Sequence, residues 1–65
     1  TMNYPYSAVT NRETWFLRMG DKSTKLPKGH PLTVHDEDSG FGYVSIQENG
    51  GTMFGSVDSD HYDAV

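Results

Sequence analysis

The chain has 65 residues, of which 34% are hydrophobic and 12% aromatic, and its formal net charge is −4. A chain of this length forms one small domain that buries roughly 60% of its unfolded surface. It contains no cysteine, which excludes disulfides, thiol chemistry and cysteine-ligated zinc. The longest apolar run, Trp15–Leu17, is far shorter than the roughly 20 residues of a membrane span, so we expect a cytoplasmic protein without membrane contact.

The charges are divided along the chain. All five basic residues lie in the first 28 positions beside two acids, which gives +5 − 2 = +3. Residues 29–65 carry the other seven acids and no base, which gives −7. An acidic surface repels nucleic acid and attracts basic protein surfaces. The charge pattern therefore favours a protein partner over direct DNA or RNA binding.

Residues 1–12 are predicted to form a flexible N-terminal arm ahead of a domain that spans residues 13–65. The arm contains Tyr4-Pro5-Tyr6 and shows no apolar period. Pro5 favours an extended conformation at the residue before it. Tyr4 and Tyr6 are amphipathic and could dock on a partner when the arm becomes ordered.

The first strand is predicted at residues 14–19, because apolar and aromatic residues alternate there. We expect Trp15, Leu17 and Met19 to face inward and Phe16 outward. A short helix from Asn11 to Met19 is the competing interpretation. Residues 22–28 are predicted to form a basic loop.

Three further strands are predicted at residues 31–35, 41–48 and 52–57. The inward residues are Leu32, Val34, Val44, Ile46, Met53 and Val57, which leaves Phe41, Tyr43 and Phe54 outward. Residues 36–40 are predicted as an acidic turn, and Asn49-Gly50 favours a tight hairpin turn. Asp58 is expected to start a single helical turn, and residues 64–65 to add a last short strand.

Several short segments resemble the bacterial type of SH3 domain between Trp15 and Tyr62. They are Leu17-Arg18-Met19-Gly20, Leu26 to Val34, Gly40 to Ile46, Asn49-Gly50 and Gly55 to Tyr62. In this resemblance Phe41 takes the place usually held by tryptophan, whereas Gly42 and Ser56 stand where the family has aromatic residues. The resemblance implies an all-β fold, a small SH3-like barrel of four or five short antiparallel strands, and recognition of peptides or of cell-wall material.

The sequence contains none of the nucleophile, phosphate-loop or zinc-protease motifs, so we expect neither an enzyme nor a cofactor. A cation site formed by Asp58, Asp60, His61 and Asp63 is an alternative. A capping aspartate within a solvated acidic tail explains the same residues, and no metal site is predicted.

We therefore expect a monomeric, non-enzymatic regulator or inhibitor that binds a larger nucleic-acid-handling protein with a basic surface, such as RNA polymerase. Small acidic single-domain chains resemble in type the host-takeover proteins of bacteriophages. The predicted partner-binding residues are Tyr4, Tyr6, Asp36, Glu37, Asp38, Phe41, Tyr43, Glu48 and Phe54. The alternatives are a peptide or cell-wall recognition module, and a nucleic-acid binder that uses the basic N-terminal half beside Trp15 and Phe16.

Overall fold

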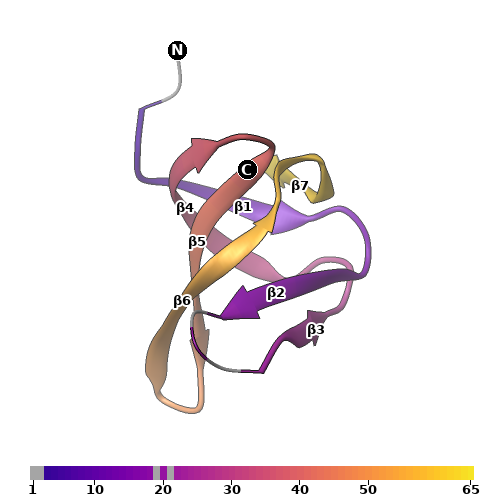
Figure 1. The fold of residues 1–65 in the computed structure, drawn as a ribbon. Coiled ribbons are helices and arrows are strands. Elements are labelled where there is room, and N and C mark those ends of the chain that lie inside the picture. Colours follow the sequence, from indigo (N-terminus) through magenta and orange to yellow (C-terminus); the bar gives the residue numbers. More distant parts are fainter. Residues whose placement is uncertain (1–2, 19, 21) are drawn as a thin grey trace.

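The computed structural model describes residues 3–18, 20 and 22–65, and these form a nearly all-β fold (Figure 1). The strands are β1 (Tyr6–Thr10), β2 (Thr14–Arg18), β3 (Thr24–Leu26), β4 (Pro31–Asp38), β5 (Phe41–Glu48), β6 (Gly51–Asp58) and β7 (Tyr62–Ala64), and a 3-10 turn, η1 (Ser59–His61), precedes β7. The all-β prediction is confirmed, although the sheet has seven strands instead of four or five. In the described part of the chain, no helix has the length and apolarity to cross a membrane.

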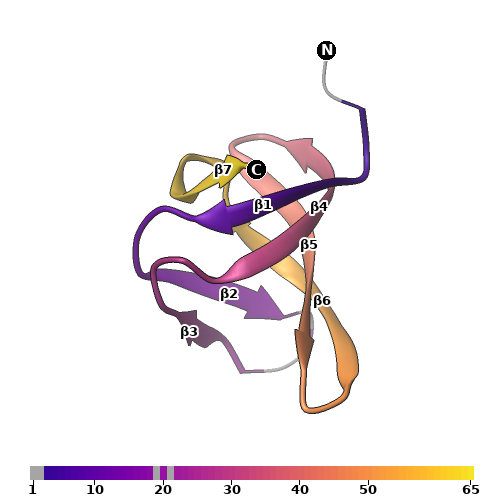
Figure 2. The same ribbon diagram turned by 180° about the vertical axis from the view of Figure 1, so that it is seen from behind.

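The strands form one antiparallel sheet in the order β3-β2-β6-β5-β4-β1-β7, and this sheet is strongly curled (Figures 1 and 2). In a flat sheet β2 and β1 would lie four strand spacings, or about 19 Å, apart. The linker from Thr10 to Thr14 reaches at most about 14 Å, so the sheet must curl to bring β1 and β2 within reach of each other. The end of β1 is also fixed to the segment before β4, because Thr10 donates its amide to the carbonyl of His30 at 3.0 Å and accepts from the amide of Gly29 at 2.8 Å.

β1 lies where the sequence predicted a flexible arm. It pairs with β4 on one side and with β7 on the other, and both Ala8 and Thr10 are buried. The residues of this strand are mostly small, so their apolar alternation is weak in the sequence, yet small side chains suit a strand packed between two others. β3 likewise occupies the predicted basic loop, and its last residue, Leu26, belongs to the core.

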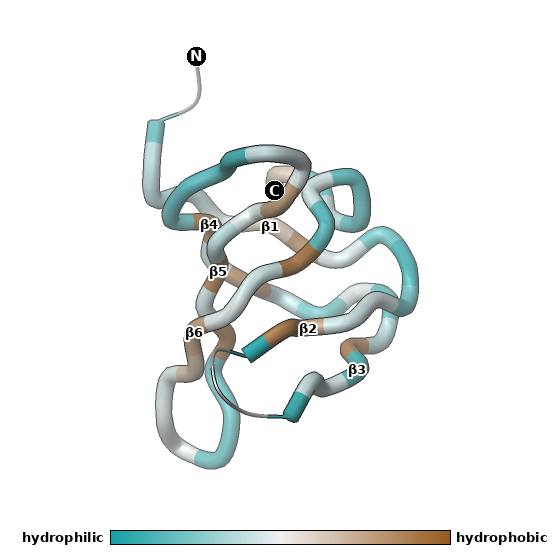
Figure 3. The backbone as a smooth tube through the Cα atoms, viewed as in Figure 1, coloured by the Kyte–Doolittle hydropathy of each residue, from teal (hydrophilic) through white to brown (hydrophobic). Residues whose placement is uncertain are grey.

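The core lies inside the curl. Its members are Ala8, Phe16, Leu26, Leu32, Val34, Val44, Ile46, Val57 and Tyr62. The inward faces predicted for β4 and β5 are confirmed, as is Val57 on β6. Figure 3 shows hydrophobic segments on the strands and hydrophilic turns between them.

The inward face predicted for β2 is wrong. Phe16 is fully buried at 0% exposure, whereas Trp15 is 52% and Leu17 41% exposed. Trp15, Phe16 and Leu17 are all apolar, so their sequence does not indicate which side chains face inward. The buried Thr14 lies on the same side of β2 as Phe16. Met19, the third residue predicted to face inward, lies outside the described residues.

The turns agree with the sequence at two places and differ at a third. Asn49 and Gly50 have φ angles of 52° and 77°, as the predicted hairpin turn requires. Asp58 accepts a hydrogen bond from the amide of Asp60 at 2.9 Å and so caps η1. The predicted acidic turn is shorter than expected, because residues 36–38 belong to β4 after a bulge and only Ser39-Gly40 makes the turn.

Candidate protein-binding site

Large apolar side chains gather on the outer face of β2, β5 and β6. The exposed members are Trp15, Leu17, Phe41, Tyr43 and Phe54. The register explains why they meet: Leu17 pairs with Ser56, which pairs in turn with Tyr43. Directly paired residues lie on the same face of a sheet. Because β2 has the opposite orientation to the predicted one, Trp15 and Leu17 join the outward residues predicted on β5 and β6.

The first hollow on this face, which we call the acidic groove, has a volume of about 290 Å³. Its lining residues are Glu13, Thr14, Trp15, Leu17, Phe41, Asp58 and His61. One wall is held in place because Thr14 Oγ1 and His61 Nδ1 are hydrogen-bonded at 2.7 Å, which ties β2 to η1. The groove thus combines two exposed aromatic rings with two carboxylates.

A cation already lies at the edge of the acidic groove. The Lys25 ammonium is 4.6 Å from the centroid of the Trp15 ring, and it is 3.5 Å from a Glu13 carboxylate oxygen. An ammonium over a tryptophan ring gains roughly 0.5–1 kcal/mol at an exposed site. The surroundings of Trp15 are therefore suited to a positive charge.

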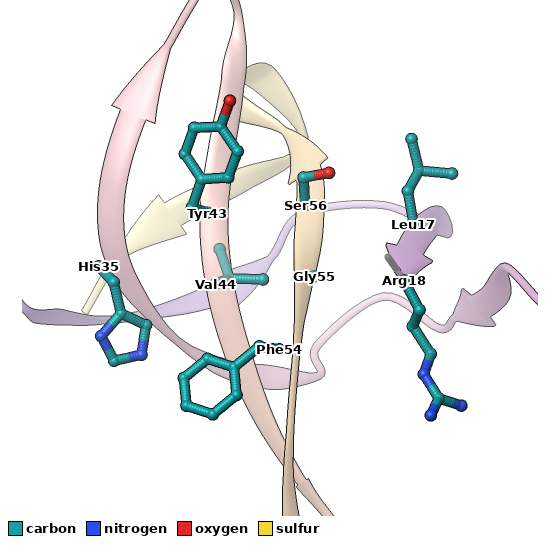
Figure 4. Close-up of a pocket in the computed structure, with 8 residues that line it drawn as sticks. All are labelled: Leu17, Arg18, His35, Tyr43, Val44, Phe54, Gly55 and Ser56. Carbon is teal, nitrogen blue, oxygen red and sulfur yellow. The ribbon is translucent and has the colours of Figure 1, made fainter. Parts of the chain in front are cut away.

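The second hollow, which we call the apolar groove, has a volume of about 400 Å³ (Figure 4). Its lining residues are Leu17, Arg18, His35, Tyr43, Val44, Phe54, Gly55 and Ser56. Figure 4 shows Leu17 and Arg18 on one side of β6, with Tyr43 and His35 on the other. Leu17 also lines the acidic groove, so the two hollows adjoin at that residue.

The predicted acidic residues are divided between three places. Asp36 pairs with Tyr43 and Asp38 with Phe41, which puts both carboxylates beside the aromatic face. Glu48 pairs with Gly51 at the far end of β5, beside the hairpin turn. Of the four predicted carboxylates, Asp36 and Asp38 therefore lie beside the aromatic side chains of Phe41 and Tyr43.

Glu37 and the two predicted N-terminal tyrosines form a separate cluster with Tyr62. The Glu37 carboxylate accepts hydrogen bonds from the hydroxyls of Tyr4 at 2.7 Å, Tyr6 at 2.9 Å and Tyr62 at 2.5 Å. Gly42 makes room for this cluster, since a side chain there would collide with the Tyr62 ring. The hydroxyls of Tyr4 and Tyr6 thus bind to the domain itself.

The tyrosine cluster changes the acid–base behaviour of its members. Hydrogen bonds from Tyr62 and Tyr4 lower the pKa of Glu37 below its ordinary value. The bond to Glu37 raises the pKa of Tyr4 to about 12. Desolvation, together with the same carboxylate, raises the pKa of Tyr62 and Tyr6. The folded state therefore favours an ionised Glu37 among neutral tyrosines.

These pKa shifts predict that the free energy of unfolding depends on pH. The Glu37→Gln substitution should reduce both this dependence and the stability near neutral pH. A lowered carboxyl pKa stabilises the fold above the ordinary value of 4.5, and this contribution is lost as the pH falls through the folded value. The raised tyrosine pKa values stabilise the fold below pH 10, and this contribution is lost as the pH rises through the folded values. Loss of the charged acceptor should cost about 1–2 kcal/mol near neutral pH.

Urea unfolding of the Glu37→Gln variant between pH 3 and pH 11 checks this expectation. The matched control is Asp38→Asn, which removes a neighbouring carboxylate that accepts a hydrogen bond from the Ser39 hydroxyl at 3.3 Å. The control should keep the wild-type pH profile. Equal profiles for Glu37→Gln and the wild type would show that the cluster does not contribute to stability.

Several residues of the site were missed by sequence reasoning. Trp15 and Leu17 were assigned to the interior, and His35 and Asp58 were not assigned to a binding surface. The apolar run Trp15-Phe16-Leu17 itself indicated an exposed apolar residue, because successive side chains of a strand point to opposite faces of the sheet. No such signal existed for Asp58, whose position beside Phe41 follows from the pairing of β5 with β6.

Comparisons with protein-family models, curated proteins and solved structures return no match. Within the described ranges, no group of three or more His, Asp or Glu side chains is placed to hold a metal ion. At the alternative cation site, His61 Nε2 lies 3.8 Å from an Asp58 carboxylate oxygen. The geometry of the two grooves is therefore the basis for a functional assignment.

Proposed function

We propose that this protein is a non-enzymatic protein-binding domain whose acidic groove docks on a basic segment of a larger protein. The observation that carries the proposal is the Lys25 ammonium held against Trp15 and Glu13. A positively charged side chain of a partner would meet the same kind of environment at Phe41 and Asp58, which are paired across β5 and β6 and both line the groove.

The composition of the groove supports a protein ligand. Exposed aromatic side chains in a shallow hollow are typical binding hot spots, because they bury a large area at a low cost in conformational entropy. Asp38, which pairs with Phe41, adds a third carboxylate to the two that line the groove. The resemblance to SH3 domains, in which Phe41 takes the place of a tryptophan, supports peptide recognition at the same position.

The partner class follows from charge. Residues 29–65 carry a charge of −7. An acidic surface attracts basic surfaces over a distance set by the salt concentration. Proteins that handle nucleic acid present basic surfaces of this kind. We infer a cytoplasmic regulator or inhibitor that occupies such a surface, and RNA polymerase is one candidate of this class.

The non-enzymatic part of the proposal is supported by the burial of Thr14, the hydroxyl of one nucleophile-like arrangement. Thr14 is hydrogen-bonded to His61, and His61 lies near Asp58, in the order of a nucleophile, a base and an orienting acid. Thr14 is only 4% exposed, however, so its hydroxyl has little access to a substrate. This arrangement is better explained as the connection that holds η1 against β2.

Calorimetric titration of the full chain with an acetylated hexapeptide of alternating leucine and arginine tests the proposal. We expect binding that weakens as the salt concentration rises, and that falls about fivefold or more in Phe41→Ser. Lys25→Met should tighten binding by about two- to fivefold, because it removes the internal cation from Trp15. Lys28→Met is the matched control, since it removes one positive charge outside the groove.

Two results would contradict the proposal. One is equal affinity for the arginine peptide and for its glutamine analogue, which would leave no role for charge. The other is an equal effect of Lys25→Met and Lys28→Met, which would reduce the role of Lys25 to a change in net charge.

A further inference from the structure

The apolar groove continues the acidic groove, because Leu17 lines both of them. Its walls include Leu17, Tyr43 and Phe54, whose side chains are 41%, 47% and 65% exposed. Burial of such side chains by a partner gains free energy from the hydrophobic effect. A segment bound in the acidic groove therefore has an apolar surface directly beside it.

The apolar groove is hollow because a small side chain lies between larger ones. Ser56 on β6 pairs with Tyr43 on β5 and with Leu17 on β2, so these three residues form one row across the sheet (Figure 4). Directly paired residues lie on the same face of a sheet. Phe54 lies two positions from Ser56 on β6, on that same face. The hollow over Ser56 is thus walled by apolar side chains.

One wall of the apolar groove is held in position before any ligand binds. The rings of Phe54 and His35 lie with centroids 5.6 Å apart. His35 is fixed in turn by a hydrogen bond of 2.7 Å between its Nε2 atom and Oγ of Ser45, which is buried. Such support lowers the entropy lost when the Phe54 side chain becomes ordered in a complex.

The two grooves are one side-chain repeat apart along β5 and β6. Phe41 pairs with Asp58, and both line the acidic groove. Two positions further along each strand, Tyr43 pairs with Ser56, and both line the apolar groove. Side chains i and i+2 of an extended chain point to the same side, about 6.6 Å apart. An extended segment that follows β6 can therefore place one side chain in each groove.

We propose that the two grooves together bind one extended protein segment, in which a basic residue and a large apolar residue are separated by one position. This inference rests on the proposed function of the acidic groove and adds a second contact to it. The basic side chain lies at Phe41 and Asp58. The apolar side chain lies between Leu17, Tyr43 and Phe54. Adjacent residues of an extended chain point to opposite sides, so a basic and an apolar residue without the spacer do not fill both grooves.

The test is an NMR titration of the ¹⁵N-labelled full chain with acetylated, amidated tetrapeptides of identical composition. Ser-Arg-Ser-Phe and Ser-Phe-Ser-Arg carry the proposed spacing in the two chain directions, and in Ser-Arg-Phe-Ser the two residues are adjacent. We expect one of the spaced peptides to bind about fivefold tighter than the adjacent one, because only its phenylalanine is buried together with its arginine. That peptide should shift the amide signals of Asp58 and Phe54 in parallel.

Substitutions in the apolar groove complete the test. Phe54→Ser and Tyr43→Ser should each lower the affinity of the tighter spaced peptide about three- to fivefold, to near that of the adjacent peptide. The matched control is Thr52→Ala, since Thr52 is exposed on the same strand and lines neither groove. This control should leave the affinity unchanged. Thermal melting of each variant shows that the fold is retained.

The outcomes separate this inference from the proposed function. Equal affinity of the spaced and adjacent peptides, or shifts confined to one groove, would overturn the inference, and binding that weakens with salt would still support the acidic groove. Binding of the leucine–arginine hexapeptide without binding of any tetrapeptide would likewise overturn the inference alone. Absence of binding for all four peptides would overturn the proposed function and this inference together.

Discussion

Phe16→Ala should leave most of the chain unfolded at room temperature, whereas Trp15→Ala, one position earlier, should leave it folded. Phe16 is completely buried and Trp15 is half exposed. Truncation of a buried phenylalanine costs about 3–5 kcal/mol. A domain of this size without disulfides has a net stability of only a few kcal/mol, so this single loss is comparable to the whole.

Circular dichroism and urea unfolding of the two variants provide the measurement. For Trp15→Ala we expect a loss of less than about 1 kcal/mol, because the ring leaves a solvent-exposed position. The pair is informative because the two residues are adjacent on β2 and differ in the face they occupy. A stable Phe16→Ala variant together with an unfolded Trp15→Ala variant would show that β2 has the opposite orientation, and it would remove Trp15 from the acidic groove.

Gly55→Ala should be the second most destabilising change. The pairing of β2 with β6 consists of Leu17 with Ser56 and Arg18 with Gly55. A Cβ atom at Gly55 would lie 2.6 Å from the Leu17 carbonyl oxygen and 2.9 Å from Cζ of Phe16. A backbone oxygen cannot move without separating the strands, so we expect a loss of about 3 kcal/mol, at the upper end of overpacking costs.

Gly51→Ala is the matched control for Gly55→Ala, since both positions lie on β6. The nearest atom to a Cβ at Gly51 is the carbonyl oxygen of Glu48, at 3.9 Å, which is ordinary contact. Urea unfolding should therefore show a change of no more than about 0.5 kcal/mol for Gly51→Ala. Equal stabilities of the two variants would mean that β2 and β6 are not in close contact at Gly55.

The central strands could be predicted from the sequence because each carries a strong local signal. Leu32 and Val34 alternate with polar residues in β4, and Val44 and Ile46 do the same in β5. Asn49-Gly50 joins β5 to β6 by a turn that few other residue pairs allow. Asp58 capped its 3-10 turn as predicted, through a bond to an amide two residues later. All of these features depend on residues close together in the chain.

The features that the sequence did not predict depend on distant partners. β1 exists because β4 and β7 lie on either side of it, and those strands come more than twenty residues later. The orientation of β2 places the Phe16 ring against Gly55 on β6, which is 39 positions later in the sequence. In the tyrosine cluster, Glu37 accepts hydrogen bonds from hydroxyls of residues that lie 25 to 33 positions from it in the sequence. A local pattern contains no information on such contacts.

Only part of the acidic groove could be predicted from the sequence, because most of its residues come together through contacts between distant segments. Of the residues that line the groove, Phe41 was assigned to a partner-binding surface, together with its neighbour Asp38. Asp58 lies beside Phe41 through the pairing of β5 with β6, and Trp15 reaches the groove through the position of β2. The division of charge along the sequence predicted an acidic binding surface, and the structure adds that Glu13, from the basic half of the chain, contributes to it.

A double-mutant cycle between Asp58 and an arginine of the bound peptide tests the central claim most directly. Affinities are measured for the wild type and for Asp58→Asn, each with the leucine–arginine hexapeptide and with a version in which one arginine is replaced by glutamine. If the acidic groove holds that arginine, Asp58→Asn weakens binding of the parent peptide about three- to tenfold and has little effect on the replaced peptide, a coupling of about 0.7–1.4 kcal/mol. Additive losses for every arginine in turn, with no coupling to Asp58, would contradict the claim that this groove is the docking site.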